Sequence, residues 1–140
     1  MTGAEDLHGA EHVERYLATD GREGHDWRRD APVLLLTTIG RQSGEARTTP
    51  LIYQPHGDAY AVVASKGGSA APPAWYRNLE ANPDVQVQVK GDRFAARART
   101  ATPDEKPELW TKMTAVWPDY DDYQRRTERE IPVVVLERAE

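Results

Sequence analysis

The stretch "LLLTTIGRQSGEARTTPLIY", residues 34–53, carries the strongest structural signal in this chain. Both of its ends are apolar and β-branched, as strands are, and its polar centre is bounded by Gly40 and Gly44. Because glycine permits left-handed backbone conformations, the centre is predicted to be the tip of a β-hairpin. A hairpin tip needs no guanidinium groups, yet Arg41 lies in it and Arg47 follows it. The tip is therefore a candidate anion site, with a solvated turn as the alternative.

The composition narrows the classes of protein to consider. A chain of 140 residues that is 39% hydrophobic can bury the core of one domain. It has no cysteine, which excludes disulfides, thiol redox centres and cysteine-bound metal clusters. A net charge of −5 argues against nucleic-acid binding, so any anion site must be local. The N-terminus is too polar for a signal peptide and no apolar run can span a membrane, so a cytoplasmic location is expected, with peripheral membrane contact left open.

Further strands are predicted downstream of the hairpin. The strict alternation of "VQVQVK" (85–90) predicts a strand with one buried face. The other candidate strands are "AYAVVAS" (59–65), "RFAARART" (93–100) and "IPVVVLER" (131–138). The intervening "QPHGD" (54–58) is predicted to be a turn.

Helices are expected in three places. Residues 5–19 have apolar positions near helical spacing, with Gly21 as a stop. "APPAWYRNLEANP" (71–83) predicts a short helix, and "TPDEKPELWTKMTAVW" (102–117) a longer one capped by Thr102.

These elements together predict the fold class. Strands that follow one another as hairpins, with few βαβ alternations, argue against a doubly wound parallel sheet. We therefore predict one domain, residues 1–140, of the α+β and mainly β class. It should contain a barrel of about six mostly antiparallel strands, beginning near Pro32, with peripheral helices.

Three further segments contain residues that could bind a ligand. In "VVASKGG" (62–68) a predicted strand ends at Ser65 and Lys66, before two glycines that would let a ligand approach the backbone. The aromatic residues of "AWYRNLEANP" (74–83) could form a ligand wall or core. Trp117 and the tyrosines that follow it at three-residue intervals are expected to share one helical face, as core or as a pocket wall.

The histidines and nucleophiles give weaker signals. His8 and His12 have the spacing of two ligands on a helix, but no third ligand accompanies them, so no metal site is predicted. His25 and His56 lie in predicted loops and are expected to be solvated. No G-x-S-x-G nucleophile motif occurs in the sequence.

Four segments, taken together, resemble the deazaflavin-dependent nitroreductase family. They are "LLLTTIGRQSGEARTTPLIY", "VVASKGG", "PAWYRNLEANPDVQVQVKG" and "WPDYDDYQRRTEREIPVVVLE", and they occur in order between about Pro32 and Glu137. Members of this family are mainly actinobacterial split β-barrel proteins that use coenzyme F420. The resemblance implies a split β-barrel and the transfer of a hydride from the reduced deazaflavin to a quinone, an enone or a nitroaromatic. No side-chain nucleophile is required for such a reaction.

The resemblance also implies roles for individual residues. The hairpin tip would hold the phosphate and glutamate tail of the cofactor through Arg41, Gln42, Ser43, Arg47, Thr48 and Thr49. The ring and its wall would be lined by Val63, Ala64, Ser65, Lys66, Ala74, Trp75, Tyr76, Arg77, Asn78 and Tyr120. The acceptor pocket would contain Ile52, Trp117, Tyr120 and Tyr123. Catalytic hydrogen bonding or proton relay would fall to Ser65, Tyr120 and Tyr123.

The chain departs from the family pattern at three of these positions. A lysine is usual where Gln42 stands, and nitroimidazole-reducing members carry tyrosine in place of Ile52 and Trp117. Use of the cofactor is therefore better supported than nitroimidazole reduction. Two alternatives remain open: an oxidoreductase of the flavin-mononucleotide split barrels, and a non-catalytic protein that binds or stores F420.

Overall fold

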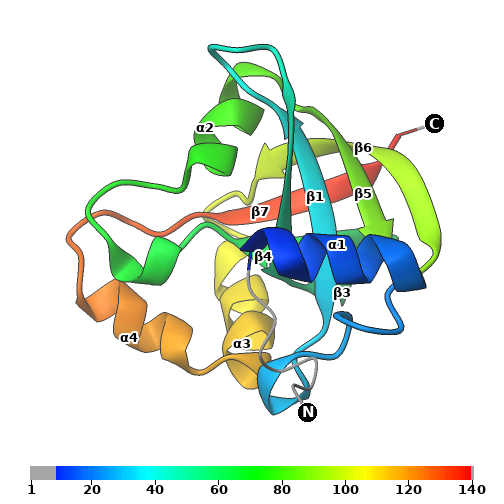
Figure 1. Cartoon of the computed structure of the whole chain (residues 1–140). Coiled ribbons are helices and arrows are strands. Elements are labelled where there is room, and N and C mark those ends of the chain that lie inside the picture. The colour runs from blue at the N-terminus through cyan, green and yellow to red at the C-terminus, as the bar shows by residue number, and fades with distance from the viewer. Residues whose placement is uncertain (1–8, 140) are drawn as a thin grey trace.

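The structure is a computed structural model that describes residues 9–139, and in this part of the chain seven antiparallel strands form one curled sheet (Figure 1). The strands are β1 (Val33–Ile39), β2 (Ala46–Ile52), β3 (Gln54–His56), β4 (Ala59–Val63), β5 (Asp84–Val89), β6 (Asp92–Thr100) and β7 (Val133–Arg138). Their order in the sheet is β2-β1-β5-β6-β7-β4-β3. Only Tyr53 separates β2 from β3, so one bent stretch of chain forms both edges and the sheet curls into a barrel.

Alternating side chains of the strands build two hydrophobic clusters, one on each face of the sheet. Leu34 and Leu36 of β1 belong to one cluster, while Val33 and Leu35 belong to the other. The same alternation occurs in β7, where all four residues from Val133 to Leu136 are buried. A sheet that is covered on both faces requires continuous apolar runs, which is why "VLLL" and "VVVL" form its centre.

Within residues 9–139, four helices cover this sheet, together with the short 3₁₀ turns η2 (Arg28–Asp30) and η3 (Lys66–Gly68). They are α1 (Gly9–Thr19), α2 (Ala74–Ala81), α3 (Lys106–Val116) and α4 (Asp119–Arg125). Helix α2 packs Trp75 and Leu79 into the cluster that contains Leu34 and Leu36. Helices α1, α3 and α4 bury Tyr16, Leu109, Met113 and Tyr120 in the other cluster. None of the helices in residues 9–139 is long and apolar enough to cross a membrane.

The predicted fold class is confirmed, with local differences. The segment predicted as a turn at 54–58 contains β3, and the turn itself is confined to Gly57 and Asp58. Counting β3 gives seven strands where about six were expected, because the bend at Tyr53 divides one long strand in two. Helix α1 begins at Gly9, while residues 5–8 of the expected helix lie outside the described residues.

The helix expected from Thr102 begins instead with a capped turn. The Thr102 hydroxyl accepts a hydrogen bond from the Glu105 backbone amide at 3.3 Å, and the Glu105 carboxylate accepts one from the Thr102 amide at 2.8 Å. This reciprocal pair is a capping box, and α3 follows from Lys106. The side chain of Arg99 also binds the Glu105 carboxylate, and this bond lowers the pKa of Glu105 to about 2.

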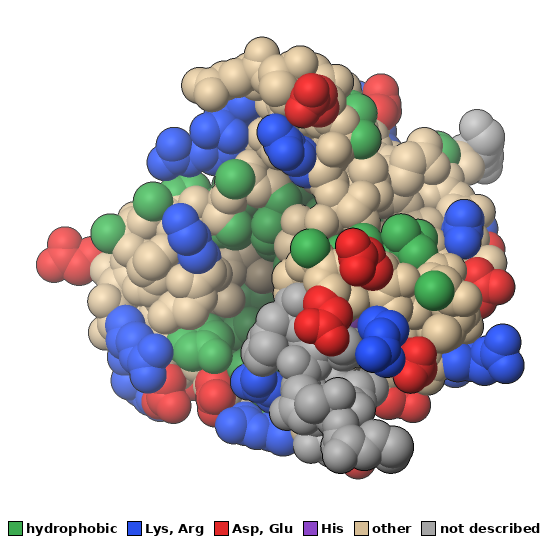
Figure 2. Space-filling view, in the orientation of Figure 1, with side chains coloured by type: hydrophobic (Ala, Val, Ile, Leu, Met, Phe, Trp, Pro, Cys, Tyr) green, Lys and Arg blue, Asp and Glu red, His purple; other side chains and the backbone are tan. Residues whose placement is uncertain are grey.

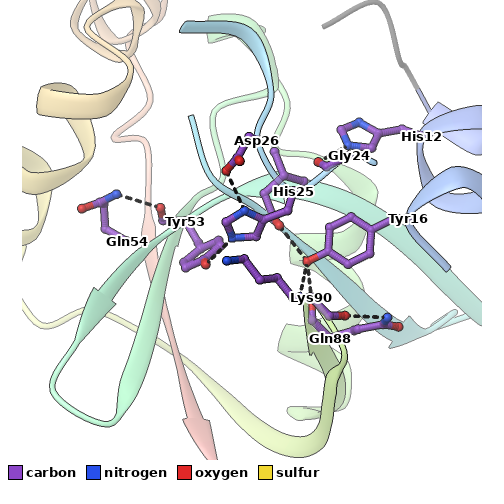
Figure 3. A network of polar contacts seen from close by, with 10 residues as sticks. His12, Tyr16, Gly24, His25, Asp26, Tyr53, Gln54, Gln88 and Lys90 are labelled. Carbon is purple, nitrogen blue, oxygen red and sulfur yellow. Dashed lines mark hydrogen bonds and ion pairs between the residues drawn. The ribbon is translucent and has the colours of Figure 1, made fainter. Parts of the chain in front are cut away.

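Helix α1 is fastened to the barrel by the fully buried Tyr16 (Figure 3). Its hydroxyl donates a hydrogen bond to the Val33 carbonyl at 2.9 Å and accepts one from the Lys90 amide at 2.7 Å. Because both groups belong to the barrel, one phenol satisfies backbone atoms of β1 and of the β5–β6 turn.

Replacing Tyr16 by Phe keeps the ring but leaves these backbone groups without their partner. We expect Tyr16→Phe to lower the free energy of unfolding by about 1–3 kcal/mol, the usual cost of a buried unsatisfied group. Tyr76→Phe is the control, because the Tyr76 hydroxyl binds only the Thr100 hydroxyl in an exposed setting. Urea unfolding of both variants measures the difference, and equal losses would contradict the anchoring role of Tyr16.

Candidate functional site

The tip of the β1–β2 hairpin and helix α2 enclose a cavity of about 290 Å³. Figure 1 shows the tip beside α2, although the two segments are far apart in the sequence. The cavity is lined by Gly40, Arg41, Gln42, Ser43, Arg47, Thr49, Ala74, Trp75 and Asn78. The structure thus brings together the two segments that the sequence indicated separately as an anion site and a ligand wall.

The buried side chain of Asn78 ties the tip to α2. Its oxygen accepts hydrogen bonds from the backbone amide of Arg41 at 3.2 Å and from the Arg41 guanidinium at 3.1 Å. Its nitrogen donates to the hydroxyl of Thr38, which is fully buried in β1, at 3.2 Å. One amide therefore fixes the end of β1, the start of the tip and the direction of the Arg41 side chain.

The two glycines of the tip differ in what a side chain would meet. Gly44 has φ +73°, a left-handed conformation that favours glycine. At Gly40 an added Cβ would lie 2.6 Å from the Ser43 hydroxyl oxygen, so the Ser43 side chain would have to move from its present position. Ser43 in turn accepts a hydrogen bond from the Glu45 amide at 3.1 Å.

The charge of the tip is exposed and only weakly neutralised. Arg47 lies 3.6 Å from the Glu45 carboxylate, and both side chains are more than half exposed. An ion pair of this kind contributes little, so the Arg47 guanidinium can exchange its partner for a ligand anion. Arg41 has only the neutral Asn78 side chain as its partner among the described residues. Two guanidinium groups thus face the cavity with their charge available.

Three residues that were predicted to contact the cofactor, one at the hairpin tip and two in the wall, point away from the tip cavity. Thr48 binds the Thr37 hydroxyl at 2.8 Å and lines a different cavity, because side chains alternate along β2 and Arg47 and Thr49 take the other face. Tyr76 binds Thr100 at 2.8 Å and lines a separate groove, and Arg77 is exposed and outside the cavity lining. Helical geometry explains this result, since residues 74, 75 and 78 share a face that 76 and 77 do not.

The segment "VVASKGG" (62–68) contains the end of β4 and then a sharp turn. Val63, Ala64 and Ser65 are buried, while Lys66 is exposed. Lys66, Gly67 and Gly68 all have positive φ, at 46°, 63° and 81°. A Cβ at Gly68 would collide with the carbonyl oxygen of Tyr123 and lie 2.9 Å from its Cα, so the loop packs directly on α4.

Arg129, which the sequence did not indicate, holds this loop from behind. Its guanidinium donates to the carbonyls of Ser65 at 2.7 Å, Ser69 at 2.8 Å and Ala64 at 3.4 Å. Burial lowers the pKa of Arg129, as desolvation of a cation does. An arginine before a strand carries no pattern that predicts such bonds, because they form only once the chain has folded.

The three predicted acceptor-side aromatics lie together but do not share one helix. Trp117 ends α3, because Pro118 starts a new helix, while Tyr120 and Tyr123 lie in α4. The Trp117 indole donates to the Tyr123 hydroxyl at 3.3 Å, and the two tyrosine rings pack edge to face. Ile52 belongs to the same buried cluster as Trp117 and Tyr120. Burial is the main cause that raises the pKa of Tyr120 above its ordinary value, and Tyr123 adds to it.

Two residues of the 25–31 loop cover this aromatic group and were not indicated by the sequence. The Trp27 ring stacks on Trp117 with centroids 5.7 Å apart. The Arg29 guanidinium lies 4.4 Å from the Trp117 ring centroid and binds both carboxylate oxygens of Asp119, at 3.2 and 3.3 Å. Both residues therefore cover the Trp117 ring.

The space-filling view shows a hollow on this face of the molecule (Figure 2). In Figure 2 a hollow floored by hydrophobic side chains opens between the α2 region and the region of η3 and α4, and basic side chains stand near its rim. A flat apolar ligand with a charged extension would suit such a surface.

The expectation that His25 is solvated was wrong. Of the histidine pair His8 and His12, the structure describes His12. His25 is buried, with its Nδ1 2.8 Å from the Asp26 carboxylate and its Nε2 2.8 Å from the Tyr53 hydroxyl (Figure 3). Its loop is pinned to the bend between β2 and β3, where burial raises the pKa of Tyr53 to about 12. His12 binds the Gly24 carbonyl at 2.7 Å, and His8 lies outside the described residues.

The role of Asn78 can be tested without a ligand. We expect Asn78→Ala to lower the free energy of unfolding by about 1–3 kcal/mol, because the Thr38 hydroxyl and the Arg41 amide lose a buried partner. Hydrogen exchange at the Arg41 amide should accelerate in the same variant. Asn82→Ala is the control, since Asn82 makes one exposed hydrogen bond to the Asp84 amide. An unchanged Arg41 exchange rate would mean that the tip is held by other contacts.

Comparison with known proteins identifies the family. A family model described as F420H(2)-dependent quinone reductase matches residues 9–138. An F420H(2)-dependent quinone reductase of Mycobacterium tuberculosis is 45% identical over 130 residues, which cover 91% of this chain and 87% of that protein. A Mycobacterium bovis protein named as a putative F420H(2)-dependent quinone reductase has the same identity and coverage.

Solved structures agree with this result. The structure described as an F420-H2 dependent reductase, FDR-A, has a TM-score of 0.70 and 39% identity, over 76% of this chain and 94% of that one. Another, described as a domain-swapped dimer, has a TM-score of 0.73 and 39% identity, over 91% of this chain and 95% of that one. The resemblance drawn from the four motifs is confirmed. This chain belongs to the F420H2-dependent quinone reductase family.

Proposed function

We propose that this protein binds coenzyme F420 and uses its reduced form to transfer a hydride to a quinone-type acceptor. The observation that carries the proposal is the cavity between the hairpin tip and α2, where Arg41 and Arg47 offer positive charge in an otherwise acidic protein. We further propose that the described residues act as one deazaflavin-binding domain.

The residues of the cavity fit the anionic part of this cofactor. A phosphate and glutamate tail needs charge-assisted donors, and Arg41, Arg47 and the Ser43 hydroxyl supply them at the tip. Gln42 adds a neutral donor where a cation is usual in the family, which should make tail binding less dependent on charge at that point. Arg41 is oriented in advance by Asn78, so its binding requires little reordering.

The ring would lie beyond the cavity, toward the segment from Val63 to Lys66. When bound, the reduced deazaflavin supplies the hydride. The chain's part is to orient the ring and the acceptor and to exclude water. Val63 keeps a small exposed area for such a contact and the fully buried Ala64 supports it from behind, while Ser65 and Lys66 offer polar groups at the border.

On the acceptor side, we propose that Tyr120 and Tyr123 donate a proton or a hydrogen bond to the acceptor oxygen. Burial raises the pKa of Tyr120, so its phenol stays protonated at neutral pH and keeps a proton to donate. Tyr123 accepts from the Trp117 indole, which leaves its own proton free for an acceptor oxygen. A quinone, whose reduction places charge on oxygen, matches this arrangement, and enones and nitroaromatics are further candidate acceptors.

A titration with two cofactors tests the proposal. We expect oxidised F420 to bind more tightly than flavin mononucleotide, with an affinity that falls as salt screens the exposed arginines. Reduced F420 should then be oxidised by menadione in the presence of the protein. Tighter binding of flavin mononucleotide would assign the chain to flavin chemistry, and tight F420 binding without turnover on any quinone would make it a storage protein.

The acceptor-side assignment can be tested separately with Tyr120→Phe. This change keeps ring packing and removes the donor, so we expect F420 affinity to stay within a few-fold while turnover with menadione falls by about 10²-fold. The melting temperature should change little. Unchanged turnover would mean that Tyr120 serves only the hydrophobic core in which it is buried.

A further inference from the structure

The turn η2 projects from a neck that is fixed to the barrel. The Trp27 amide donates to the Ala31 carbonyl at 2.9 Å, which closes the turn. The Val33 amide at the start of β1 donates to the His25 carbonyl at 2.7 Å, which joins the neck to the sheet. Because the neck is fixed in this way, the direction of η2 is set by its own backbone angles and by what its side chains contact.

The backbone of η2 is strained. Arg29 has φ 56° and ψ 29°, and Asp30 has φ 58°, so two successive residues with side chains adopt the left-handed conformation. This conformation is uncommon outside glycine. Strain of this kind persists only where surrounding contacts hold it, and it is concentrated at functional sites. The contacts of Arg29 therefore show what holds the turn in this shape.

Among the described residues, the Arg29 guanidinium has two partners, Trp117 and Asp119. It lies 4.4 Å from the centroid of the Trp117 ring and donates to both carboxylate oxygens of Asp119, at 3.2 and 3.3 Å. A planar guanidinium can bind a carboxylate with two donors and also rest on an aromatic ring, which an ammonium cannot do. Trp27 stacks on the same indole, with 18° between the ring planes. The turn thus holds the Trp117 ring with one cation and one ring.

The indole that η2 holds is the hydrogen-bond donor to Tyr123. The Nε1 of Trp117 donates to the Tyr123 hydroxyl at 3.3 Å, which is long for such a bond. A small shift of the indole would therefore break it. A phenol oxygen that accepts a bond from one side directs its own proton elsewhere, so the orientation of the Tyr123 hydroxyl depends on where the Trp117 ring lies.

We propose that Arg29 is a positioning residue for hydride transfer: by holding Trp117, it directs the hydroxyl proton of Tyr123 at the acceptor oxygen. This role rests on the proposed function, in which Tyr123 donates a hydrogen bond to the oxygen that becomes negative when the acceptor takes up the hydride. Because Asp119 pairs with the charge of Arg29, the guanidinium acts through the position of the indole and not as a second anion site.

Indole NMR of the full-length protein tests this geometry without cofactor or acceptor. In Arg29→Gln the Trp117 Nε1–H signal should move upfield and its proton should exchange faster with water, because its bond to Tyr123 is weakened. The Trp110 indole is the internal control, since it donates to the Asp121 carboxylate in α4 at 2.8 Å. A Trp117 signal and exchange rate that match the wild type would overturn the positioning role.

A double-mutant cycle tests the role in the reaction. The measurement is the single-turnover rate at which menadione oxidises reduced F420 on the protein. Arg29→Gln should lower this rate about tenfold, because a misdirected donor no longer meets the acceptor oxygen. F420 affinity should stay within about twofold, since the loss falls on the transition state. In a Tyr123→Phe background the same change should have almost no further effect, because the hydroxyl that Arg29 directs is already absent.

Two further variants control for charge and for folding. Arg125→Gln removes a cation whose partner is Asp122, an exposed ion pair within α4, so the rate should stay within about twofold. Arg29→Lys should recover part of the lost rate, because an ammonium can lie on the ring but cannot span both carboxylate oxygens. If melting curves show that Arg29→Gln is unfolded, the rates of Arg29→Lys with and without Tyr123→Phe decide.

The remaining results separate this role from the proposed function. An equal loss of rate with and without the Tyr123 hydroxyl would mean that Arg29 acts independently of it. That result, or an unchanged rate in folded Arg29→Gln, overturns the role and leaves the proposed function intact. Wild-type protein on which menadione oxidises no reduced F420 would overturn the proposed function and the role with it.

Discussion

The amide of Asn78 is the contact on which the proposed cofactor cavity depends. It joins three parts that no local sequence signal connects: the buried end of β1, the tip of the first hairpin and the helix that packs into one side of the barrel. Because Asn78 and Thr38 are both buried, breaking these bonds would leave polar groups without water or partner. The cost of desolvation therefore fixes the distance between the tip and α2.

Arg129 holds the loop after β4 in place through backbone atoms, as Asn78 holds the hairpin tip. In both cases a side chain binds backbone atoms of a loop and thereby fixes the course of that loop. At the tip the exposed donors are guanidinium groups, which suit a phosphate or carboxylate.

Much of this arrangement could be predicted from the sequence, because it depends on local patterns. The glycine-bounded hairpin, the alternating strand of β5 and the runs of apolar residues in β1 and β7 all have periodicities that report burial. The alternation of side chains along β2 also accounts for Thr48, which faces away from the tip cavity that Arg47 and Thr49 line.

The parts that could not be predicted depend on contacts between distant segments. His25 lies in a polar loop, and it is buried where that loop packs against Tyr53, a residue distant in the sequence. Arg129 and Arg29 are ordinary charged residues in the sequence, and their roles come from carbonyls and an indole ring supplied by other elements. Trp117 was expected on one helix with Tyr120, but Pro118 starts a new helix between them.

The position of the bound cofactor is the most direct test of these roles. A crystal structure of the protein with oxidised F420 should show the phosphate and glutamate tail in the cavity between the hairpin tip and α2, within hydrogen-bond distance of Arg41 or Arg47. The ring should extend from there toward the loop that follows β4. Cofactor density in the groove lined by Lys106 and Trp110, with the tip cavity empty, would contradict it.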